Sequence, residues 1–371
     1  MNIKFILLIL FYLLSQDVHA QNDQQKILTT LNHYIEGTSY NKKDVIAKAF
    51  YQNALLYLND KDDGLNVVGI KEYISWYDDG EYGKHTGRIG EVLSIDIRGD
   101  VATAKAEIIF PERDFRFIDV FLLKKLKSGW KIMSKSAHKV DGNVTGKRIL
   151  FIVSNASYHG DTSFKTGVSF SEIVNAYHTF KLAGYTVDFV SPQGGAIPLS
   201  YIDTSKKLHK QYLYNNDFMY AIGHTKTPQE ITAKNYRAVH YVGGGNAMYG
   251  VPENEALQKI SMSIYEDYNG VVSSVCHGTA GIVNLKTKDG KYLVAGKRVS
   301  GYPEAYENQK SEHFKQFPFL IQQTIEQREG LFKVSERGQA HVEVDGRLVT
   351  GQNYHSSAPV AEKIISILEN S

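Results

Sequence analysis

The chain of 371 residues contains one cysteine, Cys276, and the sequence around it limits the possible folds more than any other feature. The apolar segment Gly270–Val275 runs directly into Cys276, and the small residues of Gly278–Gly281 follow. This order is typical of a buried strand that turns sharply into a helix and exposes a nucleophile at the turn. We expect Cys276 to be catalytic, because a helix N-terminus lowers a thiol pKa and the neighbouring His277 can move protons. The alternative is a buried cysteine that only packs.

The segments on either side of this turn alternate between strands and helices. Apolar runs predict buried parallel strands at 147–153, 185–190, 236–242 and 270–275, and helical periodicity predicts helices at 171–183 and 253–267. Strands that alternate with helices at this spacing indicate a doubly wound α/β domain with a mostly parallel sheet. We assign this domain to residues 147–371.

The preceding part of the chain follows a different pattern. Helical periodicity at 25–40, 44–50 and 68–74 comes before alternating, strand-like patterns at 90–97, 101–109, 115–124 and 129–133. Helices followed by a run of strands indicate a separate α+β domain, which we assign to residues 22–138. The polar, glycine-containing segment 139–146 is predicted to be a linker.

The first twenty residues predict export. Lys4 precedes the apolar run Phe5–Leu14, and small residues at Val18 and Ala20 match a signal-peptidase site. The run is too short to cross a bilayer of about 30 Å, so a membrane anchor is the weaker alternative. We expect a signal peptide at residues 1–20, a mature chain that begins at Gln21, a periplasmic or secreted protein, and no membrane association after cleavage.

Composition argues against several classes of function. The net charge is +2 and there is no long basic run, so a nucleic-acid partner is not expected. One cysteine can form neither an intrachain disulfide nor a zinc-type cysteine pair. We expect no metal and no cofactor.

Two further segments are candidates for the same site as Cys276. Val242–Asn246 places three glycines at the end of a predicted strand, where backbone N–H groups can point at a developing oxyanion. The alternative is an ordinary tight turn between a strand and a helix. Ser169–Glu172 has the S-x-x-E spacing of a helix capping box, so Glu172 is either a cap or a carboxyl group beside the thiol.

The N-terminal domain resembles the nuclear transport factor 2-like (SnoaL-like) cone, in particular its "putative lumazine-binding" branch. The resemblance covers about residues 22–138, and it depends on layout more than on sharp motifs. It is carried by His33–Gly37, by Ala49–Ala54 and by Gly129–Ile132.

The C-terminal domain resembles the PfpI superfamily, which has the class I glutamine amidotransferase-like fold and includes parkinsonism-associated deglycase and the heat-shock chaperone-glyoxalases. The resemblance covers residues 147–369, and Cys276-His277-Gly278 with the large loops points to the chaperone-glyoxalase branch. Its motifs occur in family order: Thr166-Gly167 with Glu172, Ala183–Phe189, Ser191–Gly195 with Pro198, Gly244–Asn246, Val275–Gly278 and Asp345–Asn353. The chain departs from the pattern at Gly243, where a proline is common, and at Asn175–Tyr177, which lacks the usual proline.

The resemblance implies a role for each matching residue. Cys276 is the nucleophile, His277 its partner, and Glu172 the acid beneath the thiol. Gly244 and Gly245, with the amide of His277, supply the oxyanion donors. The acid that orients His277 is expected to be Glu304, with Glu307 as the fallback.

The implied activity is the cofactor-independent, glyoxalase-type conversion of methylglyoxal, or a similar reactive aldehyde, to a hydroxy acid, with deglycation as a related reaction. The expected partners are this small aldehyde and a second copy of the chain in a homodimer. Two alternatives stay open: a cysteine amidase or peptidase of the same fold, and a non-enzymatic chaperone or binding protein.

A second histidine competes with His277 for the catalytic role. His341 and Glu343 have the His-x-Glu spacing of glutamine amidotransferase triads. However, polar and apolar residues alternate from His341 to Val344, as in a strand, and the turn sequence Asp345-Gly346 follows. This pattern predicts a hairpin. We therefore favour His277, which the chain itself ties to Cys276.

Overall fold

The computed structural model describes residues 22–59, 64–110, 113, 115–141 and 147–370. The predicted signal peptide, residues 1–20, lies outside them. The chain divides into two compact units, Met1–Val144 and Thr145–Ser371, and each is described by itself. None of the helices in the described ranges is long and apolar enough to cross a bilayer.

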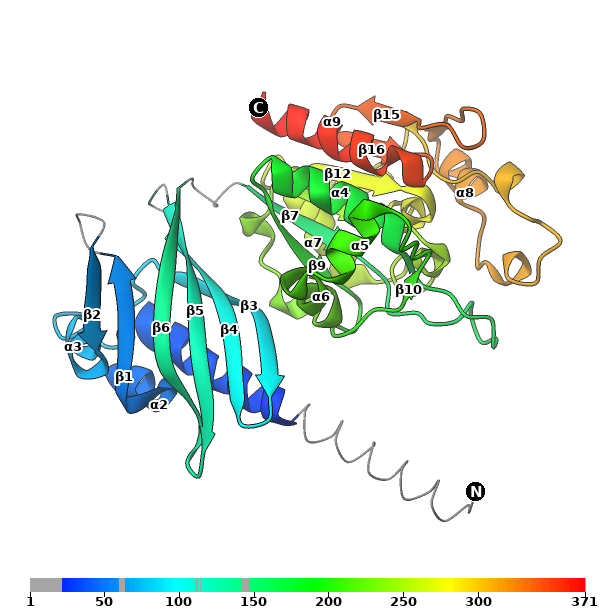
Figure 1. The fold of residues 1–371 in the computed structure, drawn as a ribbon. Coiled ribbons are helices and arrows are strands. Elements are labelled where there is room, and N and C mark those ends of the chain that lie inside the picture. Colours follow the sequence, from blue (N-terminus) through cyan, green and yellow to red (C-terminus); the bar gives the residue numbers. More distant parts are fainter. Residues whose placement is uncertain (1–21, 60–63, 111–112, 114, 142–146, 371) are drawn as a thin grey trace, which may run out of the picture. The chain divides into compact units, whose positions relative to one another are not determined.

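The first unit is a six-stranded sheet with helices packed on one face (Figure 1). The strands lie in the order β2-β1-β6-β5-β4-β3, with β1 and β6 parallel and the other neighbours antiparallel. Residues 22–39 are helical, and the other elements are α2 (Lys43–Ala49), β1 (Phe50–Asn59), β2 (Leu65–Gly69), α3 (Ile70–Ser75), β3 (Ile89–Arg98), β4 (Val101–Ile109), β5 (Phe115–Leu126) and β6 (Gly129–Asp141). The predicted α+β layout is confirmed.

The apolar stripe of the first helix explains why this unit folds around it. Ile27, Leu31 and Tyr34 recur at helical spacing and are fully buried against the sheet. On the sheet side they meet small residues of β4 and large residues of β5 and β6, such as Phe121 and Ile132. The concave face of the sheet and the helix thus share one hydrophobic core.

The sequence analysis missed or misplaced three features of this unit. Strand β1 was not predicted, because a register shift between Phe50 and Leu55 interrupts its alternation. Val68 and Gly69, predicted as helix, belong to β2, and the helix begins at Ile70. Strand β6 also continues through residues 139–141, which were predicted to be linker.

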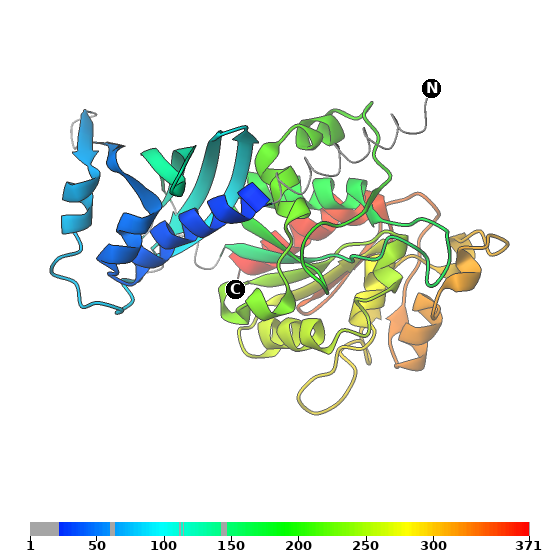
Figure 2. The same cartoon turned by 90° about the horizontal axis from the view of Figure 1, so that it is seen from below.

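The second unit is a six-stranded sheet with helices on both faces (Figure 2). The order is β15-β16-β12-β11-β7-β9, all parallel except β15. The strands are β7 (Arg148–Ile152), β9 (Thr186–Val190), β11 (Ala238–Tyr241), β12 (Val271–Val275), β15 (Val342–Asp345) and β16 (Leu348–Gly351). Helices α4 (Phe170–Leu182), α6 (Asn216–Gly223) and α9 (Ser357–Glu369) contribute to one core, and α7 (Glu255–Glu266) and α8 (Ile321–Gln327) to the other.

This arrangement confirms the predicted doubly wound α/β sheet and its hairpin at Asp345-Gly346. The element after Cys276 differs from the expectation. Instead of an α-helix that starts at Gly278, a seven-residue 3₁₀ helix, η4 (Cys276–Ile282), begins at the cysteine itself. The turn at the carboxyl end of β12 is therefore tighter than predicted.

Candidate active site

Cys276 sits in a strained turn between β12 and η4. Its φ of 55° lies in the left-handed region, which a residue with a side chain rarely adopts. Glycines allow the surrounding backbone to approach closely. A Cβ atom at Gly278 would lie 2.3 Å from the carbonyl oxygen of Tyr241, and one at Gly243 would lie 2.3 Å from Oε2 of Glu172. The strained backbone that is typical of a nucleophile elbow is therefore present at Cys276.

His277 lies between the thiol and a carboxylate. Its Nδ1 is 3.5 Å from Sγ of Cys276, and its Nε2 is 2.5 Å from Oε1 of Glu307. The Tyr302 ring stacks on the imidazole at a centroid distance of 4.9 Å. Because Glu307 accepts a hydrogen bond from Nε2–H, Nδ1 is left as the acceptor that faces the sulfur.

Glu304 does not orient His277, and this expectation is corrected. Its Oε1 accepts hydrogen bonds from the backbone N–H groups of Gln322 and Gln323, at 2.7 and 3.3 Å, in the first turn of α8. Glu304 begins the 3₁₀ turn η5 (Glu304–Tyr306), and Glu307, the fallback residue, directly follows the turn. The Glu304 carboxylate therefore points at the start of α8 and the Glu307 carboxylate at His277.

Glu172 lies beneath the thiol and does not cap its helix. The side chain of Ser169, at the N-cap of α4, makes no capping hydrogen bond, and the Ser169 N–H donates to the carbonyl of Gly243. The Glu172 carboxyl accepts a hydrogen bond from the Gly243 N–H at 3.0 Å and is also hydrogen-bonded to Cys276 and to the side chain, not the backbone N–H, of Ser169. The side chain is buried, with only 3% of the residue exposed. The capping-box interpretation is therefore wrong, and the carboxyl group belongs to the thiol site.

Comparison with known proteins agrees with this geometry. The model of the DJ-1/PfpI family matches residues 163–367, more than half of the chain. The chain belongs to the DJ-1/PfpI family. A second family model, described as putative lumazine-binding, matches residues 22–138, so a domain of that nuclear transport factor 2-like type precedes the DJ-1/PfpI domain.

Several relatives of the DJ-1/PfpI domain are named glyoxalases. The chain is 30% identical over 246 residues to a glutathione-independent glyoxalase of Schizosaccharomyces pombe, covering 60% of this chain and 98% of that one. It is 27% identical over 227 residues to glyoxalase 3 of Candida albicans, covering 58% and 94%. The crystal structure of glyoxalase III from Candida albicans superposes with a TM-score of 0.55 at 25% identity, covering 61% and 99%.

The thiol of the DJ-1/PfpI domain opens into a cavity of about 460 Å³. Gly244 and Gly245, the predicted oxyanion donors, line it together with Glu172, Cys276, His277 and Glu307. Gly244 has a φ of 112°, and a Cβ atom there would lie 2.5 Å from the Gly167 carbonyl oxygen and from the Ser169 nitrogen. Only glycine therefore fits this turn.

Other cavity residues were not identified from the sequence. They come from loops that carry no motif of their own, so only the folded chain shows that they meet at the thiol. They are Tyr201, Ile202, Asp203, Lys206 and Tyr354. Among the residues that the structure describes, no group of three or more His, Cys, Asp or Glu side chains is placed to hold a metal ion.

Burial controls the protonation of this site. It raises the pKa of Glu172 to about 7. Burial and the neighbouring Glu172 carboxylate also raise the pKa of the Cys276 thiol, and the His277 backbone N–H opposes them only in part. The expectation of a lowered thiol pKa is therefore corrected: η4 is a short 3₁₀ helix, and the buried Glu172 carboxyl group is hydrogen-bonded to the thiol. We infer that Glu172 and Cys276 share one proton near neutral pH.

His341 takes no part in this arrangement. Its Nε2 lies 3.0 Å from Oε1 of Glu343 on the edge strand β15, and Glu343 also binds Arg298 at 3.0 Å. Neither His341 nor Glu343 lines the thiol cavity. The geometry thus favours His277, as expected, over the His-x-Glu pair.

The shared proton predicts the effect of neutralising Glu172. In Glu172→Gln the pKa of the Cys276 thiol should fall, because the nearby negative charge is gone while the amide can still donate a hydrogen bond to the thiolate. The rate of Cys276 alkylation by iodoacetamide, followed by intact mass from pH 5 to pH 10, measures this pKa without interference from other thiols. Glu304→Gln, which changes a carboxylate outside the thiol cavity, should leave the profile unchanged. A thiol pKa that stays the same or rises in Glu172→Gln would contradict the inference.

Proposed function

We propose that the chain converts a small 2-oxoaldehyde such as methylglyoxal to the corresponding hydroxy acid, without glutathione. The observation that carries this proposal is the placement of one buried thiol between Glu172, a carboxyl group whose pKa is raised to about 7, and a histidine held by the carboxylate of Glu307. The glyoxalase names of the relatives support the same reaction class.

The first step is addition of the thiol to the aldehyde carbon. Cys276 Sγ forms the new C–S bond as its proton passes to Glu172, and the carbonyl oxygen becomes the oxyanion of a hemithioacetal. The His277 backbone N–H, which already donates to Sγ, would lie beside this oxygen, and Gly245 lines the same cavity. Return of the thiol proton from Glu172 to the oxyanion completes the adduct.

The second step moves a proton from the former aldehyde carbon to the neighbouring carbon. Nδ1 of His277 faces the sulfur, so it is the base nearest to this carbon, and Glu307 stabilises the imidazolium that forms. Return of a proton to the neighbouring carbon, together with transfer of the hydroxyl proton to the oxygen on that carbon, gives a thioester of the hydroxy acid. Water then cleaves the C–S bond and restores the thiol, so the net reaction adds one water molecule to the substrate.

Glu307 binds His277 and Glu304 does not, so substitutions at these two glutamates form a matched pair of variants. Glu307→Gln should lower kcat for methylglyoxal on the order of a hundredfold with little change in KM, because the imidazolium that forms on His277 loses the negative charge that stabilises it. Glu304→Gln and His341→Ala should stay within a few-fold of the unaltered chain. Lactate formation at several methylglyoxal concentrations measures both constants. Equal losses in Glu307→Gln and Glu304→Gln, or a loss confined to His341→Ala, would rule out this assignment of roles.

We also propose that the protein is exported after cleavage behind Ala20. The support is the order of Lys4, the apolar run Phe5–Leu14 and the small residues Val18 and Ala20. N-terminal sequencing of the protein, expressed from its full-length reading frame in a bacterium and recovered from the periplasm or medium, should begin at Gln21. Recovery of only the uncleaved chain, starting at Met1 in the cytoplasmic fraction, would refute export.

A further inference from the structure

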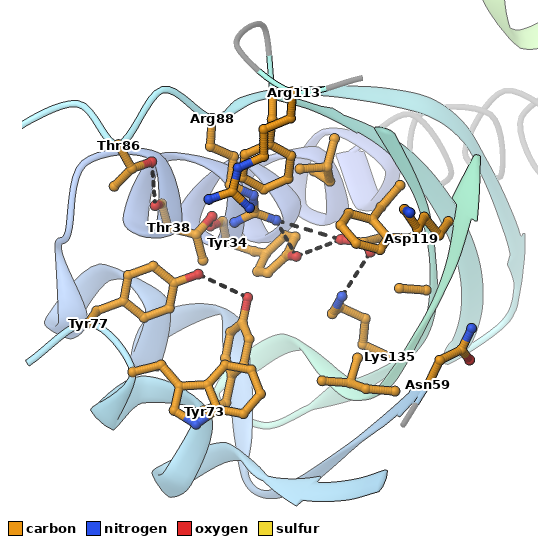
Figure 3. A pocket seen from close by; sticks show the side chains of 17 residues that line it. Tyr34, Thr38, Asn59, Tyr73, Tyr77, Thr86, Arg88, Arg113, Asp119 and Lys135 are labelled. Atoms are coloured by element: carbon orange, nitrogen blue, oxygen red, sulfur yellow. Dashed lines mark hydrogen bonds and ion pairs between the residues drawn. The ribbon is translucent and has the colours of Figure 1, made fainter. Parts of the chain in front are cut away.

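The N-terminal domain contains a cavity of its own, of about 580 Å³ (Figure 3). It is bounded by the helix 22–39, by α3 and by the concave face of the sheet. It is larger than the cavity at the thiol, and nothing in the chemistry of Cys276 uses it. The residues that line it therefore need a separate explanation.

One buried carboxylate organises the polar side of this cavity. Asp119 accepts a hydrogen bond from the Tyr34 hydroxyl at 2.5 Å and from the Lys135 ammonium at 2.8 Å. The Arg88 guanidinium lies 3.7 Å from the same carboxylate and donates to the Tyr34 hydroxyl at 2.5 Å. Figure 3 shows these four side chains converging on one side of the pocket.

The charges in this group do not balance. Arg88 and Lys135 are two basic side chains against one acid, and Asp119 is closer to Lys135 than to Arg88. Arg88 keeps its charge at any pH at which the protein is folded. Its side chain is only 7% exposed, and its Nη1 has no hydrogen-bond partner in the described part of the chain. A buried cation with an unused donor is costly unless an anion satisfies it.

The remaining wall of the cavity is aromatic. Tyr73, Trp76 and Tyr77 come from α3 and the residues after it, Phe110 directly follows β4, and Phe117 lies in β5. Tyr73 and Tyr77 lie across the pocket from the polar group in Figure 3. Asp119 is the one acidic side chain among the described lining residues, whereas Arg113 adds a further basic one. The cavity thus combines flat apolar surfaces with an excess of positive charge.

We propose that this cavity binds a small molecule that carries a carboxylate on an aromatic body. The carboxylate would be held at Arg88, whose guanidinium matches it in shape and charge. The ring would lie against Tyr73, Trp76 and Tyr77. This site does not depend on the glyoxalase reaction proposed for Cys276.

Tryptophan fluorescence provides a readout that is specific for this domain. The chain has two tryptophans, Trp76 and Trp130, and both belong to the N-terminal domain. Titration of the full chain with benzoate should change the fluorescence to a saturating value, and Trp76→Phe should remove that change. Benzamide, which has the same shape without the charge, should bind at least tenfold more weakly, and the cation benzamidine should give no saturable change.

Two arginine variants test whether Arg88 holds the carboxylate of the ligand. Arg88→Met should weaken benzoate binding at least tenfold and abolish the preference over benzamide. Arg98→Met, which removes an exposed arginine from the end of β3, should bind benzoate like the unaltered chain. Circular dichroism shows whether Arg88→Met has folded. If it has not, the comparison of benzoate, benzamide and benzamidine on the unaltered chain tests the proposal. The proposal is overturned if benzoate and benzamide bind equally well, if no ligand gives a saturable change, or if both arginine variants lose binding alike.

Discussion

The left-handed backbone of Cys276 is the constraint on which the thiol site depends. A φ of 55° at a residue with a side chain costs on the order of 1–3 kcal/mol, and the surrounding packing must hold it in place. The parallel ladder of β12 with β11 and β16 fixes the backbone up to Val275, and the contact of Gly278 with the Tyr241 carbonyl fixes it afterwards. Between these two points the thiol can only project out of the sheet, towards Glu172 and His277.

Once the thiol is placed in this way, its chemistry follows from burial. Isolation from water raises the pKa of Glu172 to about 7, and this shifted value lets a carboxyl group take up and release a proton near neutral pH. His277 is held differently, by Glu307 on its far side and by the stacked ring of Tyr302. The two proton carriers therefore flank one sulfur atom and differ in their surroundings, as a reaction that needs both an acid and a base requires.

Local sequence was sufficient for the layout of both domains and for residues that are neighbours in the chain, but not for strand β1. It was also insufficient where distant loops meet. The strand, Cys276 and His277 are contiguous, so their arrangement could be predicted. The choice between Glu304 and Glu307 depended on the direction of a short 3₁₀ turn, which no periodicity encodes. The sign of the thiol pKa shift was also out of reach, because it depends on burial and on the Glu172 carboxyl group, which is distant in sequence. In the N-terminal domain, the group formed by Tyr34, Arg88, Asp119 and Lys135 was not predicted, because its members are distant from one another in sequence.

The role of Cys276 as the nucleophile is tested most directly by replacing it. Methylglyoxal is incubated with the unaltered chain and with Cys276→Ala, lactate is quantified over time, and circular dichroism confirms that the variant is folded. Because each proposed step passes through a bond to this sulfur, the variant should form lactate no faster than a blank without protein, while the unaltered chain forms it catalytically. A folded Cys276→Ala protein that retains most of the lactate formation would contradict the central role of the thiol.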